Sequence, residues 1–111
     1  MDYRLKKEKD FNAVFKNGKK LYSSDLTLIY IPADCLKVGF AVGKKHGGSV
    51  VRNRIKRVLR ESFRSFTQEI RQNFFFVIIP KVKDTPYSVE DCKKNLYYLL
   101  NKGGFLKENN A

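Results

Sequence analysis

The segment at residues 50–64, VVRNRIKRVLRESFR, carries the side chains whose types and spacing are best suited to chemistry. Seven of its fifteen residues are cations or, at Asn53, an amide that can hydrogen-bond a phosphate. At ~100° per residue, Arg52, Lys56 and Arg60 follow one another along one side of a helix. Like charges at this spacing destabilise an isolated helix by about 0.2–0.5 kcal/mol per pair, so the pattern favours an external polyanion that offsets the repulsion. The other members of this basic face are Asn53, Arg57 and Arg64.

Arginine suits phosphate recognition because its planar guanidinium binds two oxygens at once and also stacks on bases. The alternative is that this is an ordinary solvated helix face. Solvated faces usually mix both signs of charge, whereas residues 44–64 hold eight cations and a single acid, Glu61. Lys44 and Lys45 belong to this basic stretch and are predicted to border the same anion site.

The helix that presents these cations is predicted to begin after Ser49, a good N-cap residue, and to end near Asn73. Its apolar residues recur at steps of three and four, so they form a stripe that must face a core. That stripe comprises Ile55, Val58, Leu59, Ser62, Phe63, Phe66 and Ile70.

A helix and two or three strands are predicted before this helix. Residues 7–17 have helical spacing, and Gly18 follows as a C′ residue that would take left-handed dihedrals. LTLIYI at 26–31 predicts a strand that is covered on both faces. LKVGFAVGKK at 36–45 alternates, with large apolar side chains on one face. The opposite face is nearly without side chains, so another backbone or a ligand could approach it closely, at Gly39, Ala41 and Gly43.

The C-terminal part is predicted to contain a strand and a helix. FFFVIIP at 74–80 is continuously apolar, as in a central strand. Ser88, with Asp91 three residues later, marks the start of a last helix that Gly103 closes. Residues 107–111, KENNA, are predicted to be a disordered tail. The order of elements predicts a single α+β domain over residues 1–111, with a sheet in one layer and helices against it.

The composition limits the classes of partner that the protein could bind. The net charge of +12 on 111 residues attracts polyanions, with nucleic acid favoured and an anionic membrane surface as the main competitor. No apolar run reaches the ~20 residues of a membrane span. The first ten residues lack the apolar segment of a secretory signal, so Cys35 and Cys92 are expected as reduced thiols in the cytoplasm.

Catalysis by this chain is not predicted. Metal-dependent nucleases cluster carboxylates around two ions, whereas the acids here are scattered along the sequence. Metal-free nucleases need a general acid and a general base, often two histidines, and the chain has only His46. Beside two glycines, His46 is expected to be a loop residue.

The motif RNRIKRVLRESFR, preceded by VGFAVGKK, closely resembles the signature of the bacterial ribonuclease P protein subunit. DFNAVFKNG is similar to that family's first helix, and FFFVIIPK with a following turn and helix matches in order and spacing. The resemblance extends from Leu5 to Leu106. It implies an αβββαβα sandwich with a four-stranded sheet and a left-handed βαβ crossover, although right-handed crossovers are the strong default.

The resemblance also implies a function. In this family a large RNA with bound metal ions, magnesium being expected, removes the 5′ leader of precursor tRNA. The protein, one copy per RNA and without a cofactor of its own, binds the catalytic RNA and the single-stranded leader. By position, the catalytic-RNA contacts are Arg52, Asn53, Lys56, Arg57 and Arg60. The leader cleft between sheet and first helix is expected to include Phe11, Phe15, Tyr30, Lys44, Lys45 and Arg64.

Two predictions about this cleft remain sensitive to local structure. Phe11 and Phe15 form an i, i+4 pair that could stack on unpaired bases, and core packing is the alternative. Tyr30 lies on a strand, where a shift of one residue in register would turn it to the other face of the sheet. Two other functions are compatible with the residues: a general RNA-binding protein, such as a small ribosomal protein or RNA chaperone, and a self-sufficient nuclease.

Overall fold

The computed structural model describes residues 3–71 and 73–107. Within these ranges the chain follows the predicted αβββαβα order. The predicted disorder at 107–111 lies outside the described residues except for Lys107, whose backbone N–H donates to the Glu69 carbonyl at 2.7 Å. The elements are α1 (Glu8–Asn17), β1 (Lys19–Tyr22), β2 (Leu26–Pro32), β3 (Lys37–Phe40), the 3₁₀ turn η1 (Lys44–His46), α2 (Ser49–Arg64), β4 (Phe74–Pro80) and α3 (Val89–Lys102).

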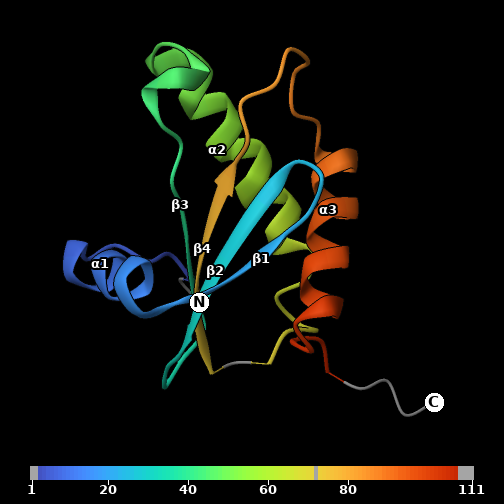
Figure 1. Ribbon diagram of the computed structural model, residues 1–111. Coiled ribbons are helices and arrows are strands. Elements are labelled where there is room, and N and C mark those ends of the chain that lie inside the picture. Colours follow the sequence, from blue (N-terminus) through green and yellow to red (C-terminus); the bar gives the residue numbers. More distant parts are fainter. Residues whose placement is uncertain (1–2, 72, 108–111) are drawn as a thin grey trace.

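The four strands form one mixed sheet in the order β1-β2-β4-β3. β4 is central, as its continuous apolar sequence predicts, and it pairs antiparallel with β2 and parallel with β3. In Figure 1 both β3 and β4 run upward, β4 lies to the right of β3, and α2 lies behind the sheet. The β3–α2–β4 connection is therefore left-handed, as the resemblance implies and against the general preference.

The sheet has two unequal faces. Helices α2 and α3 cover one face, and α1 alone packs on the other (Figure 1). The α2/α3 face holds the larger core, which includes Phe63, Phe76 and Leu99. The core on the α1 face consists of Leu5, Val14, Ile29 and Val77, with half-buried side chains around them.

Two glycines allow α1 to approach the sheet. A Cβ at Gly39, on β3, would collide with the Phe11 ring, so close packing at this glycine is confirmed. The predicted strand over 36–45 is too long, because β3 ends at Phe40, and a Cβ at Gly43 would have no heavy atom within 4 Å. A Cβ at Gly18 would collide with the Ile29 side chain and the Val14 carbonyl. The prediction of left-handed dihedrals at Gly18 is wrong, because its φ and ψ are −75° and 152°. Glycine is needed there for space.

Both predicted ends of the basic helix differ from the structure. Ser49 is already the first residue of α2, and the N-cap is Gly48, which offers no side chain to cap the helix. The helix ends at Arg64, nine residues before Asn73. It ends early because the hydroxyls of Ser65 and Thr67 donate to the carbonyls of Ser62 and Arg64 at 2.7 and 3.0 Å. These side-chain bonds compete with continued helix.

The N-terminal residues cover the outer edge of β3. The Leu5 N–H donates to the Val38 carbonyl at 2.9 Å, and the Val38 N–H donates to the Tyr3 carbonyl at 2.7 Å. Arg4 forms an isolated parallel bridge with Val38. This short pairing protects an edge that would otherwise expose unpaired backbone groups.

A polar network fixes α3 to the loops beside it. Ser88 caps α3 as predicted, its hydroxyl accepting from the Asp91 N–H at 3.2 Å. Asn95, only 8% exposed, accepts from the Ser23 hydroxyl at 2.6 Å and from the Asp25 N–H at 3.0 Å. These bonds join the β1–β2 turn to α3.

Candidate nucleic-acid interface

Helix α2 divides into a buried stripe and a basic face. Ile55, Leu59, Ser62 and Phe63 are buried against the sheet and α3, which confirms the apolar stripe in the helical part of the sequence. Next to the stripe, Arg52 and Lys56 are half-buried. The basic face continues outward through exposed side chains at Asn53, Arg57, Arg60 and Arg64.

Within residues 3–71 and 73–107, the cations of this face have no counter-ion. Among the residues that the structure describes, no carboxylate pairs with any cation of this face. These cations are Arg52, Lys56, Arg57, Arg60 and Arg64. The Nε of Arg52 is buried and has no hydrogen-bond acceptor in the described part of the chain. Within the described ranges, no ion pair therefore offsets the repulsion along the helix, and a polyanion docked against α2 would offset it.

A groove beside β3 joins α2 to α1. It has a volume of about 260 Å³, and we call it the β3 groove. Lys56 and Arg60 of α2 line one side, and Phe11 of α1 lines the other. Gly39 lies between them. The groove thus combines an aromatic ring, a glycine and four cations, two of them from α2, which suits an unpaired nucleic-acid strand.

A second hollow, of about 160 Å³, lies between β3 and the C-terminal half of α2. Arg60 lines both hollows, whereas Arg64 lines only this second one. Val38 and Phe40 of β3 also border both. Arg64 therefore lies near the expected cleft but outside the β3 groove.

The two phenylalanines of α1 are arranged as a pair. Their ring centroids are 6.5 Å apart with an interplanar angle of 23°. Phe11 is half-buried against Gly39, while Phe15 is 42% exposed. Phe15 thus presents an aromatic surface next to the groove that Phe11 lines.

Tyr30 does not lie with these phenylalanines. Its ring packs in the core on the α2/α3 face, edge-on to Phe105 at 4.7 Å between centroids. The expectation that Tyr30 lines the cleft beside α1 is wrong, because Ile29 and Ile31 occupy the α1 face of this strand. Both faces of β2 are covered, so alternation of polar and apolar residues could not set the register in advance.

The expected contributors from the loop before α2 lie apart from the β3 groove. Lys44 and Lys45 are exposed in η1, and neither lines the groove. His46 is a loop residue as predicted, and its Nε2 lies 3.0 Å from the Pro80 carbonyl. If Nε2 carries the proton, it donates to that oxygen and leaves Nδ1 as an acceptor.

Two basic residues of the groove were not predicted from the sequence. Arg4 and Lys6 both line it, brought there by the pairing of residues 3–5 with β3. The available signal was the positive charge of the segment YRLKK. Its location beside Lys56 and Arg60 depends on the isolated β-bridge between Arg4 and Val38, which no sequence pattern predicts.

Metal sites and membrane spans are two further possibilities for a small basic protein. Among the described residues, no three His, Cys, Asp or Glu side chains gather in a way that could hold a metal ion. None of the helices in residues 3–71 and 73–107 combines the length and apolar character of a membrane span.

Comparison with known proteins decides the family. The family model described as Ribonuclease P matches residues 1–104. The chain belongs to the ribonuclease P protein family. It is 37% identical over 108 residues to the ribonuclease P protein component of Oceanobacillus iheyensis, covering 95% of this chain and 89% of that one. It is 35% identical to the component from Caldanaerobacter subterraneus, covering 95% and 92%.

Solved ribonuclease P proteins share the fold. The protein from Thermotoga maritima has a TM-score of 0.79 at 28% identity, covering 89% of this chain and 96% of that one. A Staphylococcus aureus RNase P protein, described as a mutant with defective mRNA degradation activity, has a TM-score of 0.82 at 25% identity, covering 94% and 90%. The resemblance seen in the sequence is thus confirmed. As a ribonuclease P protein component, the chain works in tRNA processing within an endoribonuclease, together with the ribonuclease P RNA.

Proposed function

We propose that the chain binds the catalytic RNA through the basic face of α2 and holds the 5′ leader of precursor tRNA in the β3 groove. The observation that carries this proposal is the continuity of the two surfaces. Lys56 and Arg60 belong to the unpaired basic face and also line the groove that contains Phe11. One helix therefore contacts both RNAs, and one protein serves one RNA.

The two surfaces recognise different features of RNA. The guanidinium and ammonium groups of α2 match phosphates of a folded RNA, which carry no sequence information. Phe11 in the β3 groove and Phe15 beside it stack on unpaired bases, an interaction worth about 1–3 kcal/mol per base and tolerant of sequence. Such a groove accepts leaders of many sequences.

The chain contributes binding and orientation in this mechanism. Holding the leader next to the bound catalytic RNA raises the effective concentration of substrate at the RNA active site. The RNA, with its magnesium ions, then hydrolyses the bond that joins the leader to the mature tRNA. His46 belongs to η1, where its Nε2 lies close to the Pro80 carbonyl of β4, and it does not line the β3 groove.

The proposal is tested by comparing precursor and mature tRNA. Affinities for the two are measured with catalytic RNA alone and with the RNA–protein complex. We expect the protein to strengthen binding of the precursor and to leave mature tRNA unchanged. The gain should disappear when the leader is shortened to one nucleotide, because the groove then has no strand to hold.

Each rival function predicts another outcome. A general RNA-binding protein would strengthen the binding of precursor and mature tRNA equally. A self-sufficient nuclease would cleave precursor tRNA at the correct site when RNA-free protein is incubated with magnesium. Nuclease digestion of the protein preparation, followed by removal of the nuclease, excludes carried-over catalytic RNA.

A further inference from the structure

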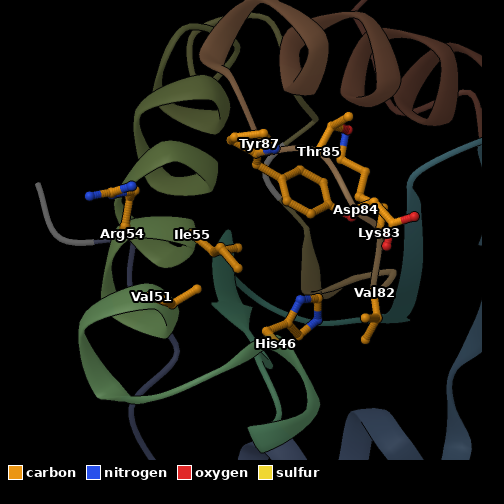
Figure 2. Close-up of a pocket in the computed structure, with 10 residues that line it drawn as sticks. His46, Val51, Arg54, Ile55, Val82, Lys83, Asp84, Thr85 and Tyr87 are labelled. Atoms are coloured by element: carbon orange, nitrogen blue, oxygen red, sulfur yellow. The ribbon is translucent and has the colours of Figure 1, made fainter.

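The flank of α2 that faces away from the β3 groove borders a separate pocket (Figure 2). It lies between η1, the first two turns of α2 and the loop at 81–87, and its volume is about 230 Å³. We call it the Tyr87 pocket. Its walls include His46, Val51, Arg54, Ile55, Val82 and Tyr87. None of these residues takes part in the contacts proposed above.

Hydrogen bonds hold the Tyr87 ring in place. The Tyr87 hydroxyl lies 3.0 Å from the Asp25 carbonyl and also within bonding distance of the Lys81 carbonyl. Lys83 places its ammonium 4.2 Å from the ring centroid and pairs with the Asp25 carboxylate at 3.2 Å. The His46 ring lies edge-on to the Tyr87 ring, with 6.5 Å between the ring centroids. The pocket is therefore preformed around a fixed aromatic ring.

Two exposed apolar side chains flank the mouth of the pocket. Val51 is 43% exposed on the α2 side, and Val82 is 58% exposed on the loop side. In Figure 2 both side chains border the space in front of Tyr87. Val51, Ile55 and Val82 give the pocket apolar sides, which suit a planar ring system. Lys83, Asp84 and Thr85 also line the pocket, and Tyr87 is 9% exposed. The volume is below the ~300–1,000 Å³ of sites for drug-sized ligands, so it suits a single nucleobase.

A cation lies at the edge of this apolar space. Arg54 lines the pocket, but its guanidinium is directed outward, away from Tyr87 (Figure 2). No carboxylate pairs with Arg54 among the described residues. Arg54 and Arg57 are three residues apart and therefore adjacent on the helix surface. The basic face of α2 thus continues around the helix to the pocket.

We infer that the Tyr87 pocket receives one unpaired nucleotide of the RNA that binds α2. The base enters between Val51 and Val82 against Tyr87, and its phosphate stays outside at Arg54. This inference rests on the proposed function, since it extends the same RNA interface to the other flank of α2. It assigns the pocket to the catalytic RNA and not to the leader, which lies on the β3 side.

The test fills the pocket without changing charge. Val51→Phe and Val82→Phe, from opposite walls, should each weaken catalytic-RNA binding by roughly 5- to 150-fold, which corresponds to the loss of one stacked base. The salt dependence of binding should stay unchanged, because every phosphate contact is kept. Val50→Phe is the matched control, since Val50 is exposed and does not line the pocket. Thermal unfolding checks that all three proteins remain folded.

Chemical probing of the RNA gives the second measurement. One nucleotide should be protected by the wild-type protein and by Val50→Phe, and should become reactive with both pocket variants. The inference is overturned if both pocket variants bind and protect the RNA as Val50→Phe does. That result differs from failure of the proposed function, in which Lys56→Ala and Arg57→Ala would leave the salt dependence of RNA binding unchanged.

Discussion

The two faces of the sheet are built for different purposes. On the α2/α3 face, seventeen buried residues of the described chain form one cluster, whereas the α1 face has four. The large cluster stabilises the fold through apolar burial, at about 25 cal/mol per Å². The α1 face buries little, and its rings and backbone remain accessible beside the cations of α2. Stability and ligand binding therefore depend on largely separate sets of residues, which mutations can distinguish.

The largest expected effect comes from Phe63→Ala. Phe63 is 2% exposed, so truncation should leave a cavity and lower the free energy of unfolding by ~3–5 kcal/mol. Phe15→Ala is the counterpart on the α1 face, where a 42% exposed ring should cost less than ~0.5 kcal/mol but weaken precursor-tRNA binding. Urea denaturation measures the free energy of unfolding of both variants. Equal losses of stability would show that the two faces do not differ as described.

Arg57→Ala and Arg60→Ala should affect RNA binding without affecting the fold. Each removes a charge-assisted hydrogen bond worth ~1.5–3 kcal/mol of binding free energy. For every phosphate that is no longer neutralised, the slope of log K against log salt should fall by about 0.7–0.9. Lys94→Ala is the control, because it removes one exposed cation from α3. If the control lowers the slope equally, binding depends on net charge and not on the basic face of α2.

Gly39→Ala should disturb the α1 face specifically. The added methyl would meet the Phe11 ring and lie 3.3 Å from the Leu5 Cβ, so α1 must shift at a cost of ~1–3 kcal/mol. Gly43→Ala is the matched control, since its Cβ would have no heavy atom within 4 Å. Thermal unfolding and precursor-tRNA affinity are measured together. A normal affinity for Gly39→Ala would mean that the position of Phe11 does not matter to the groove.

Tyr87→Phe should have the smallest effect and a pH-dependent one. Losing the hydroxyl's hydrogen bonds should cost ~0.5–1.5 kcal/mol near neutral pH. Burial, together with the nearby Asp25, raises the pKa of Tyr87 from 10.0 to about 12. The unfolded tyrosine thus ionises first, and the stabilisation is complete below pH 10 and lost as the pH rises towards 12.

The difference in stability between wild type and Tyr87→Phe should accordingly shrink above pH 10. Burial also raises the pKa of the Cys92 thiol to about 11, but Cys92 is present in both proteins, so its contribution largely cancels. Urea denaturation at pH 8, 10 and 11 measures the trend. A difference that stays constant across this range would argue that the hydroxyl is as solvated in the folded chain as in the unfolded one.

Local patterns were sufficient to predict most elements and the basic face. The spacing of Arg52, Lys56 and Arg60 required only helical periodicity, and FFFVIIP was apolar enough to identify the central strand. The face occupied by Tyr30 was not predictable in this way, because its neighbours Ile29 and Ile31 are apolar as well. Tertiary packing, and not alternation, decides which of the two sets meets α1.

Other features depended on contacts distant in sequence or on side chains outside the helix. The end of α2 at Arg64 follows from the hydroxyls of Ser65 and Thr67, which bond to carbonyls of the last turn. The location of Arg4 and Lys6 in the β3 groove follows from the pairing of residues 3–5 with Val38. The Tyr87 pocket requires α2 and the loop at 81–87 to meet, and no local pattern indicates this.

The order of the strands in the sheet has a consequence for synthesis. β2 and β3 are not neighbours in the sheet, and the strand that separates them, Phe74–Pro80, is translated more than thirty residues after β3. A nascent chain on the ribosome therefore holds three strands and a basic helix without the central strand that joins them. Until β4 emerges, this cationic and incompletely folded polypeptide is free to adhere to ribosomal and other RNA. Completion of the sheet thus becomes possible only after β4 has been synthesised.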